Sequence, residues 1–157
     1  MNPANCKAAD KPGWATPGLV KSYKCTDSGV GTGYSVFAYQ MNSSANYAAS
    51  WANFNTWWGF SPPSGSGCPP ASGDTQGSVP WDDTGSNGNG FYPAAAGQTL
   101  ECGLLGSSNN EPSYAWSFPG EDAYIIAIGD PNSTFSHLDS WWTGNSDPNA
   151  APTPATP

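Results

Sequence analysis

Apolar and polar residues follow a pattern in the first third of the chain that predicts two strands and then a helix. Residues 19–25 and 34–41 are short apolar stretches joined by a glycine-rich segment, which is typical of a β-hairpin. Residues 42–44, Asn-Ser-Ser, predict a helix N-cap, because side-chain oxygens there accept hydrogen bonds from free backbone N–H groups. Apolar residues then recur at the spacing of one helix face. These residues are Tyr47, Trp51, Phe54 and Trp58.

The second half of the chain predicts more strands and a second helix. Residues 98–105, 113–118 and 123–128 are predicted strands, and the uninterrupted apolar run of the last favours burial on both faces. Residues 132–134 form a second N-cap signature. The apolar face of the helix that follows is expected to be Phe135, Leu138 and Trp142. This order of elements predicts an α+β fold, an antiparallel sheet with two helices packed on one face.

The same landmarks occur in both halves of the chain. Each half has a cysteine, a tryptophan, a glycine and a second cysteine, followed by an apolar strand, a cap signature and a pair of tryptophans. Two copies are too few for a stacked repeat array, so we expect one domain made of two pseudo-duplicated halves. Residues 61–97 are predicted to be irregular, and most of this stretch has no counterpart in the first copy. A long loop of this kind is a candidate for function.

The four cysteines predict two disulfides rather than a metal site. No two cysteines have the close spacing of a zinc motif, and His137 is the only histidine, so a zinc site would lack ligands. Composition alone leaves three connectivities open. Equivalent pairing in the two halves favours Cys6–Cys25 and Cys68–Cys102. Paired cysteines in a small chain indicate an oxidising compartment.

The extent of the domain follows from composition along the chain. Residues 1–17 are expected to be an irregular N-terminal segment, and residues 18–145 a single extracellular α+β domain. Residues 146–157 have the composition of a disordered Pro/Thr/Ala tail. No apolar run is long enough to cross a bilayer, so a membrane anchor or export signal is expected upstream.

Charge is distributed unevenly and excludes some partners. All four basic residues are lysines within the first 24 residues, which carry a net charge of +3, whereas the rest of the chain carries −11. Binding to nucleic acid depends on clustered Lys or Arg that neutralise phosphates, so a nucleic-acid partner is not expected. The acidic remainder also argues against an anionic membrane surface and favours cationic partners.

A sparse set of positions resembles a known group of extracellular domains. The landmarks are Cys68-Pro69, Trp81, Gly97, Cys102, Trp116, Leu138 and Trp141-Trp142. They resemble the extracellular C-terminal domains of actinobacterial receptor Ser/Thr kinases and of related secreted or lipid-anchored proteins. The resemblance spans roughly residues 25–144, and an arginine that such domains often carry near the position of Cys102 is missing. It implies a cell-surface module, outside a transmembrane anchor, that senses or binds a ligand.

The tryptophan pairs and the acidic loop supply the candidate ligand-binding residues. Adjacent helix residues point about 100° apart, so one tryptophan of a pair can enter the core while the other reaches the rim. Trp57 and Trp141, together with Trp81, are therefore candidates for an aromatic platform that binds a sugar ring or an apolar ligand. The alternative is that these rings only wedge the helices against the sheet. Asp82 and Asp83 follow Trp81 and are the polar candidates.

Metal and catalytic interpretations have less support in the sequence. Asp83, Asn87 and Gly88 match part of a calcium loop, but the glutamate that should complete it is missing, so no metal or cofactor is expected. No nucleophile motif accompanies His137. Paired carboxylates for glycoside hydrolysis could come only from a scattered set of acids. That set is Glu101, Glu111, Glu121 and Asp122.

The sequence thus predicts a non-enzymatic extracellular sensor or ligand-binding domain of a membrane-anchored receptor, such as a Ser/Thr kinase. Its ligand would be a small molecule, a glycan or a protein. A carbohydrate-binding module for cell-wall or extracellular glycan is the alternative, since the chain is rich in Trp, Asn and Ser and poor in charge. A small secreted hydrolase is a third hypothesis.

Overall fold

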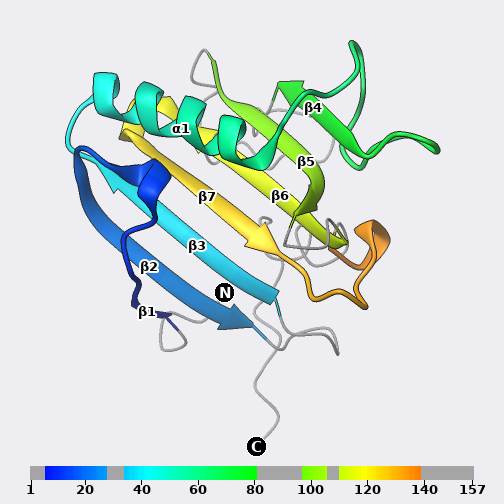
Figure 1. Ribbon diagram of the computed structural model, residues 1–157, viewed down its shortest axis with the longest axis horizontal. Coiled ribbons are helices and arrows are strands. Elements are labelled where there is room, and N and C mark those ends of the chain that lie inside the picture. Colours follow the sequence, from blue (N-terminus) through cyan, green and yellow to red (C-terminus); the bar gives the residue numbers. More distant parts are fainter. Residues whose placement is uncertain (1–5, 28–33, 81–96, 106–109, 139–157) are drawn as a thin grey trace, which may run out of the picture.

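One antiparallel sheet of seven strands organises the molecule (Figure 1). The computed structural model describes residues 6–27, 34–80, 97–105 and 110–138. In their order across the sheet, the strands are β1 (Cys6–Ala8), β2 (Leu19–Asp27), β3 (Tyr34–Met41), β7 (Ala123–Ile128), β6 (Glu111–Phe118), β5 (Thr99–Leu105) and β4 (Gln76–Pro80). The five strands predicted from the sequence are confirmed, and the fold is α+β.

The two halves of the chain meet in the middle of the sheet. The N-terminal half supplies β1–β3 and the C-terminal half supplies β4–β7. Strands β3 and β7 pair antiparallel, with Phe37 opposite Ile126 and Tyr39 opposite Tyr124. Each half therefore completes the hydrogen bonding of the other, and the halves share one sheet.

Helix α1 (Ser44–Trp58) lies across one face of the sheet (Figure 1). Its N-cap is Ser43, whose hydroxyl accepts a hydrogen bond from the Asn46 backbone N–H at 3.3 Å. Its C-cap is Gly59, whose φ of 68° is the left-handed conformation that glycine adopts without steric cost. The predicted apolar face is confirmed, since Tyr47, Phe54 and Trp58 are buried and Trp51 is half-buried.

Aromatic rings fill the space between α1 and the sheet. The ring of Tyr124 on β7 lies 5.2 Å from Tyr39, 5.4 Å from Trp51 and 6.0 Å from Phe54, measured between centroids. The Tyr124 hydroxyl also forms a buried hydrogen bond of 2.8 Å with Ser50 of α1. Burial raises the pKa of Tyr124 to about 12. This cluster holds α1 over the junction of the two halves.

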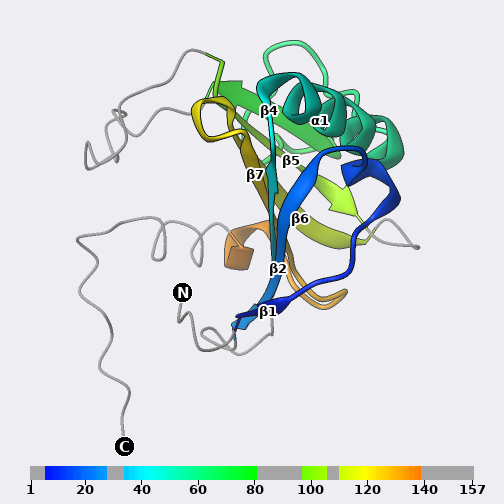
Figure 2. The same cartoon turned by 90° about the vertical axis from the view of Figure 1, so that its left-hand side faces the viewer.

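A helical turn, residues 135–138, packs on the opposite face of the sheet, where the second helix was predicted. It carries Phe135 and the fully buried Leu138. Both pack into a second core cluster that includes Tyr114 of β6, and the Phe135 and Tyr114 rings lie 6.4 Å apart. The sequence predicts both helices on one face, but Figure 2 shows this turn and α1 on opposite sides of the sheet. Strand β7 is apolar on both faces, so other elements must pack on both faces of the sheet. Helix α1 packs on one face, and this turn packs on the other.

Both predicted disulfides are confirmed. Cys6 and Cys25 lie directly opposite each other on β1 and β2, with Cα atoms 3.9 Å apart. Cys68, in the connection before β4, is joined to the buried Cys102 of β5 with Cα atoms 5.7 Å apart. Two disulfides are typical of proteins that fold in an oxidising environment, such as outside the cytoplasm.

Short elements occur where the sequence indicated irregular structure. The N-terminal segment contains β1 and the 3-10 turn η2 (Gly13–Ala15), and the segment 61–97 contains β4. Strand β4 lies very close to the preceding connection. A Cβ at Gly77 would overlap the Gly67 carbonyl, so this approach requires a glycine. No helix in the described ranges is long and apolar enough to cross a membrane.

Candidate ligand-binding groove

Of the five residues predicted to bind a ligand, the structure describes one. Trp57 lies near the end of α1 with 55% of its surface exposed, the most exposed aromatic side chain of the described chain. Trp81, Asp82, Asp83 and Trp141 lie outside the described residues. The site that the sequence assembled from these five residues therefore stays a prediction.

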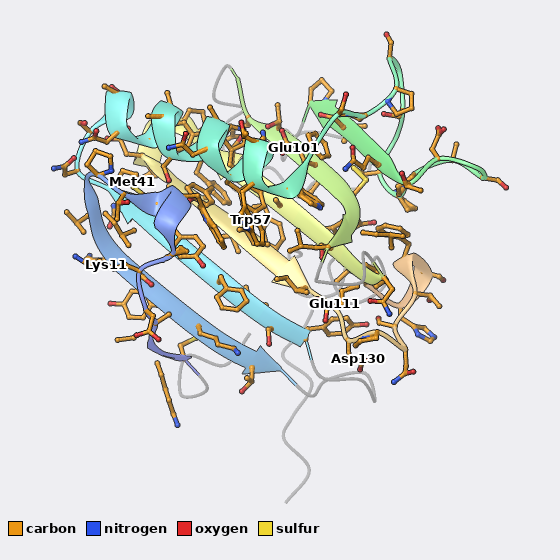
Figure 3. The ribbon with its side chains drawn as sticks, viewed as in Figure 1. Lys11, Met41, Trp57, Glu101, Glu111 and Asp130 are labelled. Carbon is orange, nitrogen blue, oxygen red and sulfur yellow. A yellow bond between two sulfur atoms is a disulfide. The ribbon has the colours of Figure 1, made fainter. Side chains whose placement is uncertain are left out.

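The tryptophan pair at the end of α1 divides as expected between core and rim. Trp58 is buried, and its indole Nε1–H donates a hydrogen bond to the Leu104 carbonyl at 3.0 Å. The exposed ring of Trp57 stacks on Trp14 of η2 with centroids 4.2 Å apart, and Figure 3 labels Trp57 beside α1. Trp14 in turn contacts the buried Phe54 at 5.9 Å. Trp57 is thus the outer member of an aromatic stack that joins η2 to α1.

A groove of about 580 Å³ runs beside this stack, between the N-terminal segment and strands β2 and β3. Its cationic lining residues are Lys7, Lys11 and Lys24, and its aromatic lining residues are Trp14, Phe37 and Tyr39. Its volume falls within the range of roughly 300–1,000 Å³ that is usual for small-molecule sites. We call it the lysine groove.

The outer wall of the lysine groove is held in place by the N-terminal segment's pairing with β2. Ala9 donates a backbone hydrogen bond to the Ser22 carbonyl at 3.0 Å, and the Ser22 hydroxyl donates one back to the Ala9 carbonyl at 3.0 Å. The chain then leaves the sheet and crosses toward α1, where the fully buried Ala15 anchors η2 (Figure 1). The Cys6–Cys25 disulfide closes the other end of this segment. The wall is therefore fixed at both ends.

The floor of the lysine groove is aromatic and belongs to β3. Phe37 and Tyr39 point to the same face of the strand, and their ring planes differ by only 2°. Tyr39 is buried, and that burial raises the pKa of its hydroxyl well above the usual range. Lys24, opposite Phe37 on β2, places its Nζ 5.3 Å from the centre of the Phe37 ring, within the range of a cation–π contact.

The electrostatics of the lysine groove are opposite to those of the chain as a whole. Three of the four lysines line it, whereas the whole chain carries a net charge of −8. Asp10 is the one acid among its described lining residues. No described carboxylate lies within 4.0 Å of the ammonium groups of these lysines. The sequence favoured cationic partners on net charge, but this surface favours an anionic ligand.

Lys7 and Lys24 occupy directly opposite positions in the β1–β2 ladder. Residues that face each other in this way have Cβ atoms about 4.5–5.5 Å apart, and like charges in such a pair are destabilising. Lys7 and Lys24 therefore repel each other beside the groove, and a bound anion would reduce this repulsion.

The candidate catalytic acids do not converge. Glu101 lies under α1, and Glu111 lies at the other end of the sheet (Figure 3). Glu121 belongs to the turn η3 (Pro119–Glu121), with Asp122 directly after it, and His137 is exposed. Among the described residues, no group of three His, Cys, Asp or Glu side chains is placed to hold a metal ion.

Glu101 is an ionisable group buried in the core rather than a groove residue. Its side chain is 6% exposed, and its Oε1 accepts a hydrogen bond of 3.0 Å from Asn55 Nδ2 on α1. Burial raises the pKa of the Glu101 carboxyl to about 7, although the Asn55 hydrogen bond lowers it in part. Glu101 Oε2 and Asn55 Oδ1 have no hydrogen-bond partner. When Glu101 is protonated, its carboxyl gains an O–H group, which supplies the hydrogen-bond donor that Glu101 Oε2 and Asn55 Oδ1 lack.

A second hollow of about 530 Å³ lies on the opposite face of the sheet. Tyr23, Phe118 and Ile125 supply its apolar surface, and Tyr23 is 44% exposed. It contains one lysine, Lys21, together with Glu121, so its formal charges balance. The lysine groove therefore has the more distinctive chemistry.

Sequence reasoning missed the lysine groove, because its residues come from four separate elements. The confinement of all lysines to the first 24 residues was the signal that could have pointed to it. Function must be inferred from the side chains of the site itself, since no protein-family model, no curated protein and no solved structure matches the chain.

Proposed function

We propose that this chain is a non-enzymatic ligand-binding domain that works at the cell surface and binds its ligand in the lysine groove. The observation that carries the proposal is the meeting of three lysines with the rings of Phe37 and Tyr39 in one groove of about 580 Å³. Aromatic walls with a few convergent polar groups are the usual composition of a binding site.

The rigidity of the groove supports binding. Its wall is held by the Cys6–Cys25 disulfide and by the hydrogen bonds between Ala9 and Ser22. A preformed site loses less conformational entropy when a ligand binds. The scattered positions of Glu101, Glu111 and His137 favour binding over hydrolysis.

A glycan is the second candidate ligand class, and the Trp14–Trp57 stack favours it. The exposed face of Trp57 lies beside a groove whose floor is already aromatic. Flat aromatic surfaces carry partial negative charge on their faces, which attracts the C–H groups of a sugar ring. A carbohydrate-binding module would use this surface directly, whereas a receptor would use it to detect a glycan.

Ligand screening by NMR tests the proposal. The labelled protein is titrated with a panel of glycans and small organic anions, and shifts are mapped onto the two hollows. Phe37→Ala removes a half-buried groove ring, and Phe118→Ala removes a half-buried ring on the opposite face. We expect Phe37→Ala to weaken binding about tenfold, from lost stacking and apolar contact, and Phe118→Ala to leave it unchanged.

Two results would contradict this proposal. Binding that survives Phe37→Ala but is lost in Phe118→Ala would move the site to the opposite face. No shift with any member of the panel would argue against a ligand-binding function for the groove. Thermal denaturation of both variants confirms that they are folded.

The receptor part of the proposal rests on the disulfides and on the resemblance to kinase ectodomains. It is tested in intact cells with the full-length protein, by adding protease to a version that carries an epitope tag in this domain. We expect the tag to be digested without lysing the cells. A tag protected until lysis would exclude a cell-surface location.

A further inference from the structure

The lysine groove also indicates the chemistry of its ligand, an inference that rests on the proposed binding function. We infer that it binds an acidic saccharide, a pyranose ring that carries a carboxylate. The inference combines the charge of the groove, the aromatic ring in its floor and the presence of one acid in its lining.

The first argument is charge complementarity. Lys7 and Lys24 face each other across the β1–β2 ladder, and Lys11 extends from the segment that forms the outer wall. Together they place three lysines around one groove of a chain whose net charge is −8. A carboxylate between Lys7 and Lys24 replaces their mutual repulsion with two attractions.

The second argument is the shape of the floor. The half-buried Phe37 ring is the aromatic surface open to a ligand, whereas the nearly parallel Tyr39 ring, with its centroid 6.5 Å away, is buried. The Lys24 Nζ lies over the Phe37 ring, 5.3 Å from the ring centroid. A ligand that stacks on the floor therefore places its substituents next to an ammonium group. This arrangement fits a ring with an acidic substituent better than a linear anion.

The third argument concerns Asp10, which would repel a simple anion. Its carboxylate accepts hydrogen bonds but cannot donate them, whereas the lysines donate but cannot accept. A ligand that satisfies both must combine an anionic acceptor with hydroxyl donors. The Thr26 side chain in the lining adds a hydroxyl that can do either. Acidic saccharides meet these requirements, and simple carboxylates and phosphates do not.

Calorimetry with a matched pair of probes tests this inference. The probes are tetragalacturonate and its methyl ester, which has the same rings and hydroxyl groups but no charge. A short polyaspartate peptide is the probe for charge without sugar. We expect tetragalacturonate to bind and the methyl ester to bind at least about fivefold more weakly. Polyaspartate should bind more weakly than tetragalacturonate, and added salt should weaken the binding of tetragalacturonate.

Charge-matched variants localise the effect. Lys24→Gln and Lys7→Gln should each weaken tetragalacturonate binding about threefold to fivefold, as for partly exposed ion pairs. Lys21→Gln removes the same charge outside the groove and should leave the affinity unchanged. Phe37→Leu keeps an apolar side chain but removes the ring, and should weaken both probes by a similar factor.

The outcomes separate this inference from the proposed function. Equal affinity for the acid and its ester, unchanged in the lysine variants, would overturn the acidic saccharide and leave a neutral glycan ligand. If Lys21→Gln weakened binding as much as Lys24→Gln, binding would depend only on the net charge of the chain, and the inference would be overturned. Binding of some other ligand class in the groove, with none for tetragalacturonate, would also overturn it but keep the binding function. Only the absence of every ligand from the groove would overturn both.

Discussion

The two disulfides join equivalent landmarks of the sequence, but the segments that they close differ in the molecule. The first, between Cys6 and Cys25, leaves the sheet, crosses its aromatic face and carries exposed lysines. The second, between Cys68 and Cys102, reaches the opposite edge of the sheet, where Cys102 is fully buried and Gly77 of β4 contacts the Gly67 carbonyl.

The comparison shows that a repeated cross-link does not imply a repeated role. The Cys6–Cys25 disulfide fixes a wall that ligands can reach, and that wall carries ammonium groups kept in solvent. The Cys68–Cys102 disulfide packs in the same core cluster as Cys6–Cys25, but the residue before Cys102 is Glu101, an ionisable group that is buried. One half of the molecule therefore keeps its lysines in solvent, while the other half buries a carboxyl at a cost in stability. The predictions below test that difference.

Removing either disulfide should have the largest effect. On the chain-entropy relation, replacing Cys68 and Cys102 by Ala should lower the free energy of unfolding by about 4 kcal/mol, and replacing Cys6 and Cys25 by about 3 kcal/mol. The order follows from their sequence separations of 34 and 19 residues. Urea denaturation measures both values.

Hydrogen exchange then distinguishes the two disulfides locally. The Ala9 amide, bonded to the Ser22 carbonyl, should lose protection only when Cys6 and Cys25 are replaced. The Ser78 amide, bonded to the Ser66 carbonyl, should lose it only when Cys68 and Cys102 are replaced. Equal loss at both amides in both variants would show that the segments do not behave independently.

Glu101 should make stability depend on pH. Its carboxyl pKa is about 7 in the folded chain and 4.5 in the reference state, so between these values the folded state binds more protons than the unfolded state. Stability should therefore fall by about 2–3 kcal/mol as the pH rises from about 4.5 to about 7, and this contribution should be constant outside that window. The high pKa of Tyr47, which also faces Glu101, is set mainly by burial and lies outside this range.

Glu101→Gln is the matched variant for this prediction. Its amide can accept from Asn55 Nδ2 and donate to Asn55 Oδ1, which now lacks a partner. We expect a gain of about 2 kcal/mol at pH 7.5 and a flatter stability profile between about pH 4.5 and 7, measured by urea denaturation across pH. A variant with the pH dependence of the wild type would show that Glu101 is not the titrating group.

Replacing one glycine by alanine in each segment closed by a disulfide should show that the second segment is tightly packed and the first is open. Gly77→Ala forces a Cβ against the Gly67 carbonyl and should destabilise the chain by about 1–3 kcal/mol. Gly13→Ala, in η2, meets no atom within 4 Å and should be neutral or stabilising by up to about 1 kcal/mol. The difference between their melting temperatures is the measurement, and similar values would mean that β4 moves to accommodate the methyl group.

The smallest effect is expected from the lysines of the groove. Lys7→Gln removes the repulsion with Lys24 across the ladder and should change the free energy of unfolding by less than about 0.5 kcal/mol, toward higher stability. Lys21, which pairs with Gln40, is the control and should show no such gain on the same substitution. A marked loss of stability in Lys7→Gln would indicate a structural role for that ammonium group.

Local patterns in the sequence predicted the regular elements well. The helix spacing of Tyr47, Phe54 and Trp58 identified α1 and its buried face, because that periodicity depends only on neighbours along the chain. The apolar run of β7 likewise indicated a central strand, although Ala123 and Ile125, on the face opposite α1, are only half-buried. The repeat of Cys, Trp and Gly positions was enough to select the disulfide pairing.

Contacts between distant residues could not be predicted in this way. Strands β1 and β4 are too short to show a period of their own and form only because β2 and β5 offer edges to pair with. The face taken by the second helix depended on which face α1 had already covered.

The same distinction between local pattern and distant contacts applies to the candidate site. The sequence by itself determined that positive charge is confined to the first 24 residues and that a helix ends in a tryptophan pair. Only the tertiary structure decided that Lys24 lies over Phe37 and that Trp14 stacks on Trp57, 43 positions further along the chain. Composition and periodicity are properties of neighbours in the chain, whereas a groove exists only where segments far apart in sequence are held side by side.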